Sequence, residues 1–362
     1  METPKIPNTS EINDVRSPPQ FKGISFSNYK KTDVRNQLIE NIKNGKLEPA
    51  AYWCAELVCA GHFQEIWEIV LHYAGKHIHL GNPKIIIYLQ MRYEIFRNIM
   101  AKGEYLVEHD LRNNATIRRL FAEVVSVLAL SPRKHSFEPI KISRESEFDM
   151  TQMSERLKAP TVGYVADIMR PRDPKEIFIP VNEFSYHVSS DSRSTIEACY
   201  WIEWVIEFDA ICKKRKVECS CDRRTHVPVE NRFQKDIIWI LWDAVKHYVD
   251  LTQNPFIQKL YDALLQIFCI KYTTAACKKR RYLLYFAVAL LTEDVKPDIE
   301  LIPQKNVVQN VVDKINLVYA QVKKSGEQSP GTDYLFAGIN EDKNNFEKSM
   351  RKMALVNELT LF

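Results

Sequence analysis

The chain has 362 residues and a formal net charge of +4; 45% of its residues are hydrophobic, 11% are aromatic and only 10 are glycine. This composition excludes a disordered chain and a sheet protein built on tight turns, and the length favours about two domains with large cores. The small positive charge permits an anionic partner without requiring one.

No apolar run reaches the roughly 18 to 20 residues that a membrane-spanning helix needs. The polar start, Met1 to Pro19, lacks the apolar core of a signal peptide. Several of the eight cysteines fall on apolar helical faces, which is typical of buried thiols in a reducing compartment. We therefore expect a soluble intracellular protein.

Residues 1–30 are rich in Pro, Ser and Asn. Such a composition cannot bury enough apolar surface to order itself, so we expect a flexible N-terminal arm. Apolar residues at three-and-four spacing, with capping residues before them and glycines or prolines after them, predict helices at residues 34–42, 50–59, 63–74, 84–100 and 116–130. We expect these helices to form a first unit at residues 31–137.

Residues 138–172 contain prolines and charges with little periodicity, so we expect a connector there. A second helical unit is expected at residues 173–294, and C-terminal helices within residues 295–362. In this last part, apolar residues at helical spacing are Val307, Val311, Ile315, Val318 and Val322. Alternation typical of strands is nearly absent, so the predicted fold class is all-α.

A tyrosine-tryptophan pair occurs in both halves of the chain, as Tyr52-Trp53 and as Tyr200-Trp201. In each half the pair is followed by a tryptophan-bearing apolar run, an Asn-Pro helix start and a pair of arginines that opens an apolar helix. These features come in the same order in both halves, but the number of residues between them differs. This pattern predicts two tandem, divergent multi-helix units that arose by internal duplication.

Four metal-ligand residue types lie in a charged insertion that the first half lacks: Cys212, Cys219, Cys221 and His226. Thiolates and an imidazole at short spacing can hold zinc tetrahedrally, and a metal would order a segment with almost no apolar content. The spacing is not that of a recognised zinc finger, so a solvated basic loop is the alternative.

Basic residues gather around the expected helix starts, at Arg118, Arg119, Arg133, Lys134, Lys278, Lys279, Arg280 and Arg281. Cations at a helix N-terminus oppose the macrodipole, so local carboxylates or an external anion such as phosphate should compensate them. These eight residues are the candidates for nucleic-acid binding, with a solvated face as the alternative.

No catalytic constellation is visible. The segment Ala74-Gly75-Lys76-His77 lacks the first glycine and the final Ser or Thr of a P-loop. The acids in apolar helices, among them Glu56 and Glu203, are more simply polar helix positions or buried partners of basic residues. We therefore expect no enzyme activity and no cofactor other than zinc.

Residues 50–137 contain Ala51-Tyr52-Trp53, Gly61, Asn82-Pro83 and the closing Leu128-Ala129-Leu130-Ser131-Pro132-Arg133-Lys134. With these residues the block resembles the helical collar region of clamp-loader-clade AAA+ proteins of the replication-associated recombination type, without the ATPase domain. The resemblance implies a helical oligomerisation module of DNA replication or repair machinery. The whole chain also resembles uncharacterised proteins of nucleocytoplasmic large DNA viruses.

These features together predict a non-enzymatic helical scaffold or accessory protein in a viral DNA replication, repair or transcription assembly. Protein partners or self-association are expected, and nucleic acid is a candidate partner. Two alternatives stay open: a structural or assembly protein of a virion, and a zinc-dependent regulator or enzyme. If the protein is viral, the host cytoplasm or nucleus is the expected location.

Overall fold

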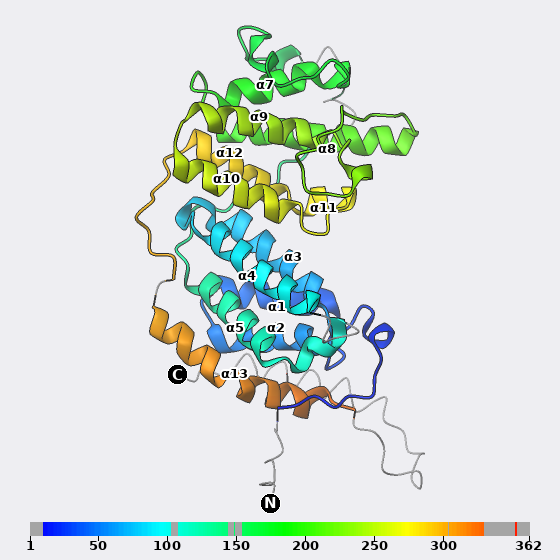
Figure 1. Cartoon of the computed structure of the whole chain (residues 1–362), viewed down its shortest axis with the longest axis vertical. Coiled ribbons are helices and arrows are strands. Elements are labelled where there is room, and N and C mark those ends of the chain that lie inside the picture. The colour runs from blue at the N-terminus through cyan, green and yellow to red at the C-terminus, as the bar shows by residue number, and fades with distance from the viewer. Residues whose placement is uncertain are drawn as a thin grey trace, which may run out of the picture. The chain divides into compact units, whose positions relative to one another are not determined.

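The computed structural model describes residues 10–102, 108–143, 148, 154–302, 304–328 and 352. Within them the chain forms twelve α-helices and no sheet, apart from one isolated bridge between Ile24 and Lys30 (Figure 1). The predicted all-α class is confirmed. None of the helices in these ranges is both long and apolar enough to cross a bilayer.

The chain divides into two compact units whose boundaries differ from the predicted ones. Unit 1 takes the described parts of residues 1–70, 92–131 and 302–362, and unit 2 takes residues 71–91 and 132–301. The C-terminal helix is therefore part of the first unit. The physical reason is that the helix stays amphipathic along its whole length and buries its apolar line inside that unit.

Unit 1 is built around a fully buried helix. Its helices are α1 (Lys31–Lys43), α2 (Leu47–Cys59), α5 (Ala115–Leu130) and α13 (Lys305–Gly326), with parts of α3 (Phe63–Tyr73) and α4 (Ile85–Ala101). Helices α1, α2 and α5 pack against one another, and α13 lies along α2 and α5 (Figure 1). Every residue of α2 from Pro49 onward is buried, as expected for a helix that is apolar on all sides.

The buried line of α13 differs from the predicted stripe. It consists of Val308, Val312, Ile315, Tyr319 and Val322. By contrast, Val307 is 40% exposed. The buried residues follow one another at intervals of four and three, and they include Tyr319, which the predicted aliphatic stripe did not contain. The buried face is therefore shifted by about one residue from the predicted face.

The predicted flexible arm is wrong for residues 10–30, while residues 1–9 lie outside the described part. Ile12, Phe21 and Phe26 are at most 1% exposed. The polar residues of the segment are bound by a buried carboxylate of α2: Ser25 Oγ donates to Glu56 over 2.8 Å. The order of this segment depends on hydrogen bonds to Glu56 of another element, which composition does not reveal.

Unit 2 contains the helices α7 (Phe178–Val188), α8 (Thr195–Arg215), α9 (Ile238–Leu251), α10 (Pro255–Phe268), α11 (Thr274–Lys279) and α12 (Arg281–Thr292). Helix α12 packs against α7, α8, α9 and α10. It is buried without interruption from Tyr282 to Leu290, so it forms the centre of this unit.

The two units share a local packing pattern. In unit 1, α1, α2 and α5 pack in all three pairwise combinations, and in unit 2 so do α7, α8 and α12. The tyrosine-tryptophan pairs lie on the middle helix of each trio, α2 and α8, in edge-to-face contact with centroids 5.4 and 5.1 Å apart. This agrees with an internal duplication, which stays a prediction.

Candidate functional site

The two arginines proposed for nucleic-acid contact in unit 1 interact within the protein. Arg118 is only 3% exposed, its guanidinium lies 4.0 Å from the centroid of the Tyr319 ring, and it donates to the Arg112 carbonyl over 2.7 Å. Arg119 is exposed and forms an ion pair with Asp313 of α13 over 2.9 Å. Arg118 is therefore a core residue and not a phosphate ligand.

In unit 2, Arg280 and Arg281 are compensated locally. Arg280 is 2% exposed and its Nη1 donates to the carbonyls of Phe268 (2.7 Å) and Ile270 (2.6 Å), at the C-terminal end of α10. Arg281 forms an ion pair with the buried Glu203 over 2.8 Å. Burial raises the pKa of Glu203, and the charge of Arg281 opposes that shift. Arg280 and Arg281 therefore do not need the external anion that the sequence predicted.

Replacing Arg280 with methionine should lower the free energy of unfolding by about 1–3 kcal/mol, because two buried carbonyls lose their donor. The exposed neighbour Lys279, changed to methionine, is the matched control and should alter stability by less than about 0.5 kcal/mol. Urea unfolding followed by circular dichroism measures both. Equal effects of the two substitutions would contradict the structural role of Arg280.

The other four basic candidates are exposed to different degrees. Lys134 pairs with Glu293. Arg133, Lys278 and Lys279 are exposed, and the nearest carboxylate to Lys278 is Glu207, at 3.7 Å. Lys278 and Lys279 end α11 and do not open α12, so the helix macrodipole favours them where they are.

The four predicted zinc ligands do not come together. The thiols of Cys212 and Cys219 hydrogen bond to each other, whereas Cys221 Sγ donates to the Asp236 carbonyl over 3.3 Å. His226 Nε2 lies 3.1 Å from Asp243. The described ranges contain no group of three or more His, Cys, Asp or Glu placed to hold a metal ion. The tetrahedral site predicted from the spacing is therefore not formed.

An arginine orders the insertion instead. Arg224 is 0% exposed and donates through Nη1 and Nη2 to both oxygens of Asp173, over 2.5 and 2.7 Å. Its Nε donates to Asp243 over 2.8 Å, and Nη1 also reaches the Asp222 carbonyl. A bidentate pair with further hydrogen bonds is a geometry in which a buried guanidinium can be held.

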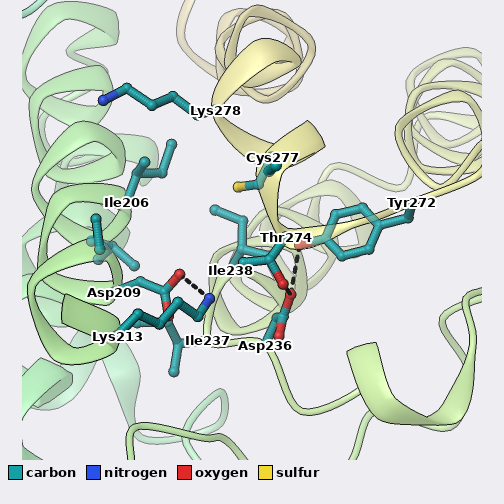
Figure 2. A pocket seen from close by; sticks show the side chains of 13 residues that line it. Ile206, Asp209, Lys213, Asp236, Ile237, Ile238, Tyr272, Thr274, Cys277 and Lys278 are labelled. Atoms are coloured by element: carbon teal, nitrogen blue, oxygen red, sulfur yellow. Dashed lines mark hydrogen bonds and ion pairs between the residues drawn. The ribbon is translucent and has the colours of Figure 1, made fainter. Parts of the chain in front are cut away.

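Unit 2 contains a cavity of about 390 Å³ (Figure 2). Three segments line it: one face of α8, the start of α9, and α11 with the loop before it. Most of the walls are apolar, from Val205, Ile206, Ala210, Ile237, Ile238, Ala275 and Cys277. The volume falls in the range of about 300–1,000 Å³ that is usual for ligand sites.

One part of the cavity wall is polar. The hydroxyls of Tyr272 and Thr274 both donate to Oδ2 of Asp236, over 2.9 and 3.0 Å (Figure 2). Burial raises the pKa of Asp236, and the charge of Lys213 opposes that shift. Lys213 itself pairs with Asp209 one helical turn away. The thiol of Cys277 is buried, which raises its pKa, so at neutral pH it is not a thiolate nucleophile.

Exposed cations border this cavity. Lys213 and Lys278, whose side chains are 47% and 59% exposed, line it from α8 and from α11. Each continues into further exposed basic residues, and we name the whole set the basic rim: Lys213, Lys214, Arg215, Lys216, Lys278 and Lys279. The structure thus joins two basic stretches that are far apart in the sequence.

Most of this site was not visible in the sequence. The run from Lys213 to Lys216 was assigned to the polar insertion, but its first three residues form the last turn of α8, where cations are favoured. The contact of Asp236 with Tyr272 and Thr274 has no local signal, because it depends on the tertiary arrangement. The sequence predicts nucleic-acid contact for Lys278 and Lys279 of this site.

Comparison of the chain with protein-family models, with curated proteins and with solved structures returned no match. The candidate site therefore stands on its geometry alone.

Proposed function

We propose that the protein is a helical scaffold that contacts nucleic acid through the basic rim of unit 2. The observation that carries the proposal is the cavity between α8 and α11, because Lys213 and Lys278 both line it. A surface on which cations from two separate segments meet is the electrostatic footprint expected of a nucleic-acid contact.

The charge balance of the rim supports this function. Asp209 neutralises Lys213, and Glu207 lies 3.7 Å from Lys278. The other four members, Lys214, Arg215, Lys216 and Lys279, are exposed and form no ion pair within the described residues. These four have no competing carboxylate in the described part of the chain, and Lys278, whose side chain is 59% exposed, is also open to a phosphate.

The collar-like sequence of residues 50–137 supports a role for this scaffold within a DNA replication or repair assembly. Unit 1, whose aromatic residues Trp53 and Trp67 are fully buried, would serve as the structural part. In this proposal the nucleic-acid contact belongs to unit 2, whereas in unit 1 Arg118 is a core residue and Arg119 pairs with Asp313.

The test is a double charge reversal, Lys214→Glu with Lys279→Glu. We expect the affinity for fluorescently labelled single-stranded DNA to fall by about tenfold or more, and the slope of log affinity against log salt to decrease by about 1.4, because two phosphate contacts are lost. Fluorescence anisotropy at low salt and across a salt titration measures both quantities.

The matched control is Lys43→Glu with Lys259→Glu, which removes the same charge at two exposed lysines outside the basic rim. The proposal fails if this control weakens binding as much, or if the unmodified protein binds neither single- nor double-stranded nucleic acid. Displacement of the DNA by polyglutamate at equal charge concentration would assign the rim to an acidic protein instead.

A further inference from the structure

We propose that the cavity of unit 2 accepts one unstacked base of a single-stranded nucleic acid while the basic rim holds the neighbouring phosphates. This inference deepens the proposed function and rests on it, because it names the form of nucleic acid. A base that is paired and stacked in a duplex cannot enter a cavity, whereas a base of a single strand can.

The walls of the cavity suit the flat faces of a base. Ile206 and Ala210 line it from α8, and Ile238 and Ala275 line it from the other segments. Nucleobase pockets commonly hold the ring between apolar or aromatic side chains, since both faces of the ring lose water on burial.

The polar group in the cavity provides an unfilled acceptor. Because Tyr272 and Thr274 both donate to Oδ2 of Asp236, its Oδ1 receives no hydrogen bond from any described residue. Every nucleobase with an exocyclic amine or a ring N–H can donate to such an oxygen. An aliphatic side chain of a protein partner would fill the apolar space but leave this acceptor without a donor. A base satisfies both requirements.

Two cations, Lys213 and Lys278, line the cavity itself. Lys278 lines the cavity, and its side chain is 59% exposed, so a base in the cavity would bring its attached phosphate close to this ammonium. Lys279 follows on α11, and Lys214 and Arg215 follow Lys213 on α8. The apolar walls match the faces of a base, the open acceptor matches its hydrogen-bonding edge, and the exposed cations match the phosphates.

The experiment compares two probes of equal length and charge: a short oligothymidylate and the same chain made only of abasic tetrahydrofuran phosphate units. We expect the unmodified full-length protein to bind the oligothymidylate about tenfold more tightly, since a stacked and buried base adds affinity that phosphates alone cannot supply. Fluorescence anisotropy at low salt measures both affinities.

Two substitutions fill the cavity from different helices, Ala210→Phe and Ala275→Phe, so one remains informative if the other does not fold. A third, Asp236→Asn, keeps an acceptor for the two hydroxyls and places an amide donor where the base needs an acceptor. Circular dichroism shows which variants are folded. In each folded variant the oligothymidylate should bind no more tightly than the abasic chain, while the affinity for the abasic chain stays within about twofold of that of the unmodified protein.

Equal binding of the two probes to the unmodified protein would overturn this inference and leave the proposed function standing. A base-dependent advantage that persists in both filled variants would also overturn it, because the base would then bind elsewhere. If neither probe binds, the proposed function fails together with the inference.

Discussion

Replacing Arg224 with alanine should lower the free energy of unfolding by about 3–5 kcal/mol. The side chain is fully buried with Asp173, whose carboxylate is also 0% exposed. Removing the guanidinium leaves the buried carboxylate of Asp173 without a charged partner in a place where water cannot replace it, and Asp243 loses one hydrogen bond. Four of the six tryptophans belong to unit 2, so urea unfolding followed by tryptophan fluorescence reports mainly on this unit.

The control for this prediction is a substitution of the neighbouring residue, Arg223. Arg223 is exposed, and Arg223→Ala should change the free energy of unfolding by less than about 0.5 kcal/mol. A chelator should leave the unfolding curve of the unmodified protein unchanged, since Arg224 and not a metal orders the insertion. A loss below about 1 kcal/mol for Arg224→Ala would contradict the assigned role.

The same ion pair determines an acid dependence. Burial by itself would raise the pKa of Asp173, but the hydrogen bonds from Arg224 and from the Arg170 and Asp222 amides outweigh it and hold the pKa below its ordinary value. A carboxylate with a depressed pKa in the folded state contributes stability above its unfolded pKa of about 3.9, and this contribution is lost as the pH falls through the folded pKa. Stability should therefore drop below about pH 4, and less so in Arg224→Ala.

Replacing Glu56 with alanine should lower the free energy of unfolding of unit 1 by about 3 kcal/mol. The carboxylate is 0% exposed and accepts bonds from Ser25 Oγ, from Ser27 N over 2.9 Å and from Ser27 Oγ over 2.6 Å. Without it these donors are buried with no acceptor, and the N-terminal segment loses its anchor on α2. Amide hydrogen exchange should show faster exchange across residues 24–30 than in the unmodified protein.

Glu40→Ala on α1 is the control, because that carboxylate is exposed. Glu56 also gives a pH signature: burial raises its pKa, although the serine hydrogen bonds oppose the shift. A carboxyl group with a raised folded pKa contributes stability below its unfolded pKa of about 4.3, and that contribution is lost as the pH rises through the folded value. Glu56→Gln should remove this pH dependence. Unchanged exchange in Glu56→Ala would refute the anchoring role.

The helices were predictable where the signal is local. The Asn254-Pro255 start is confirmed in detail, since the Asn254 side chain accepts from the amides of Phe256 and Ile257 and the proline occupies the first turn. Such signals involve residues within one or two turns of each other, but tertiary contacts can override them: Asn82 of the other Asn-Pro start donates to the Leu301 carbonyl, and α4 begins at Ile85. The predicted stop after Cys59 also holds, with Gly61 at φ +76° just beyond the helix.

The candidate site was not predictable in the same way. Arg118, Arg280 and Lys279 look alike in the sequence, yet two are in the core and one is exposed. Whether a guanidinium faces water or a carbonyl depends on which helix end lies beside it, and that is a long-range property. The N-terminal segment shows the same limit, because its serines are ordered by Glu56 from another element.

The sequence by itself determined the all-α class and, to within about three residues, the bounds of the first five helices, because helical periodicity and capping act within a few residues. Only the tertiary structure decided the bounds of the two units, the buried line of α13 and the burial of Arg224 between Asp173 and Asp243. It also decided the cavity at Asp236, where three distant segments meet. These features depend on contacts between elements, and their energies are set by packing and by buried polar groups that no local pattern records.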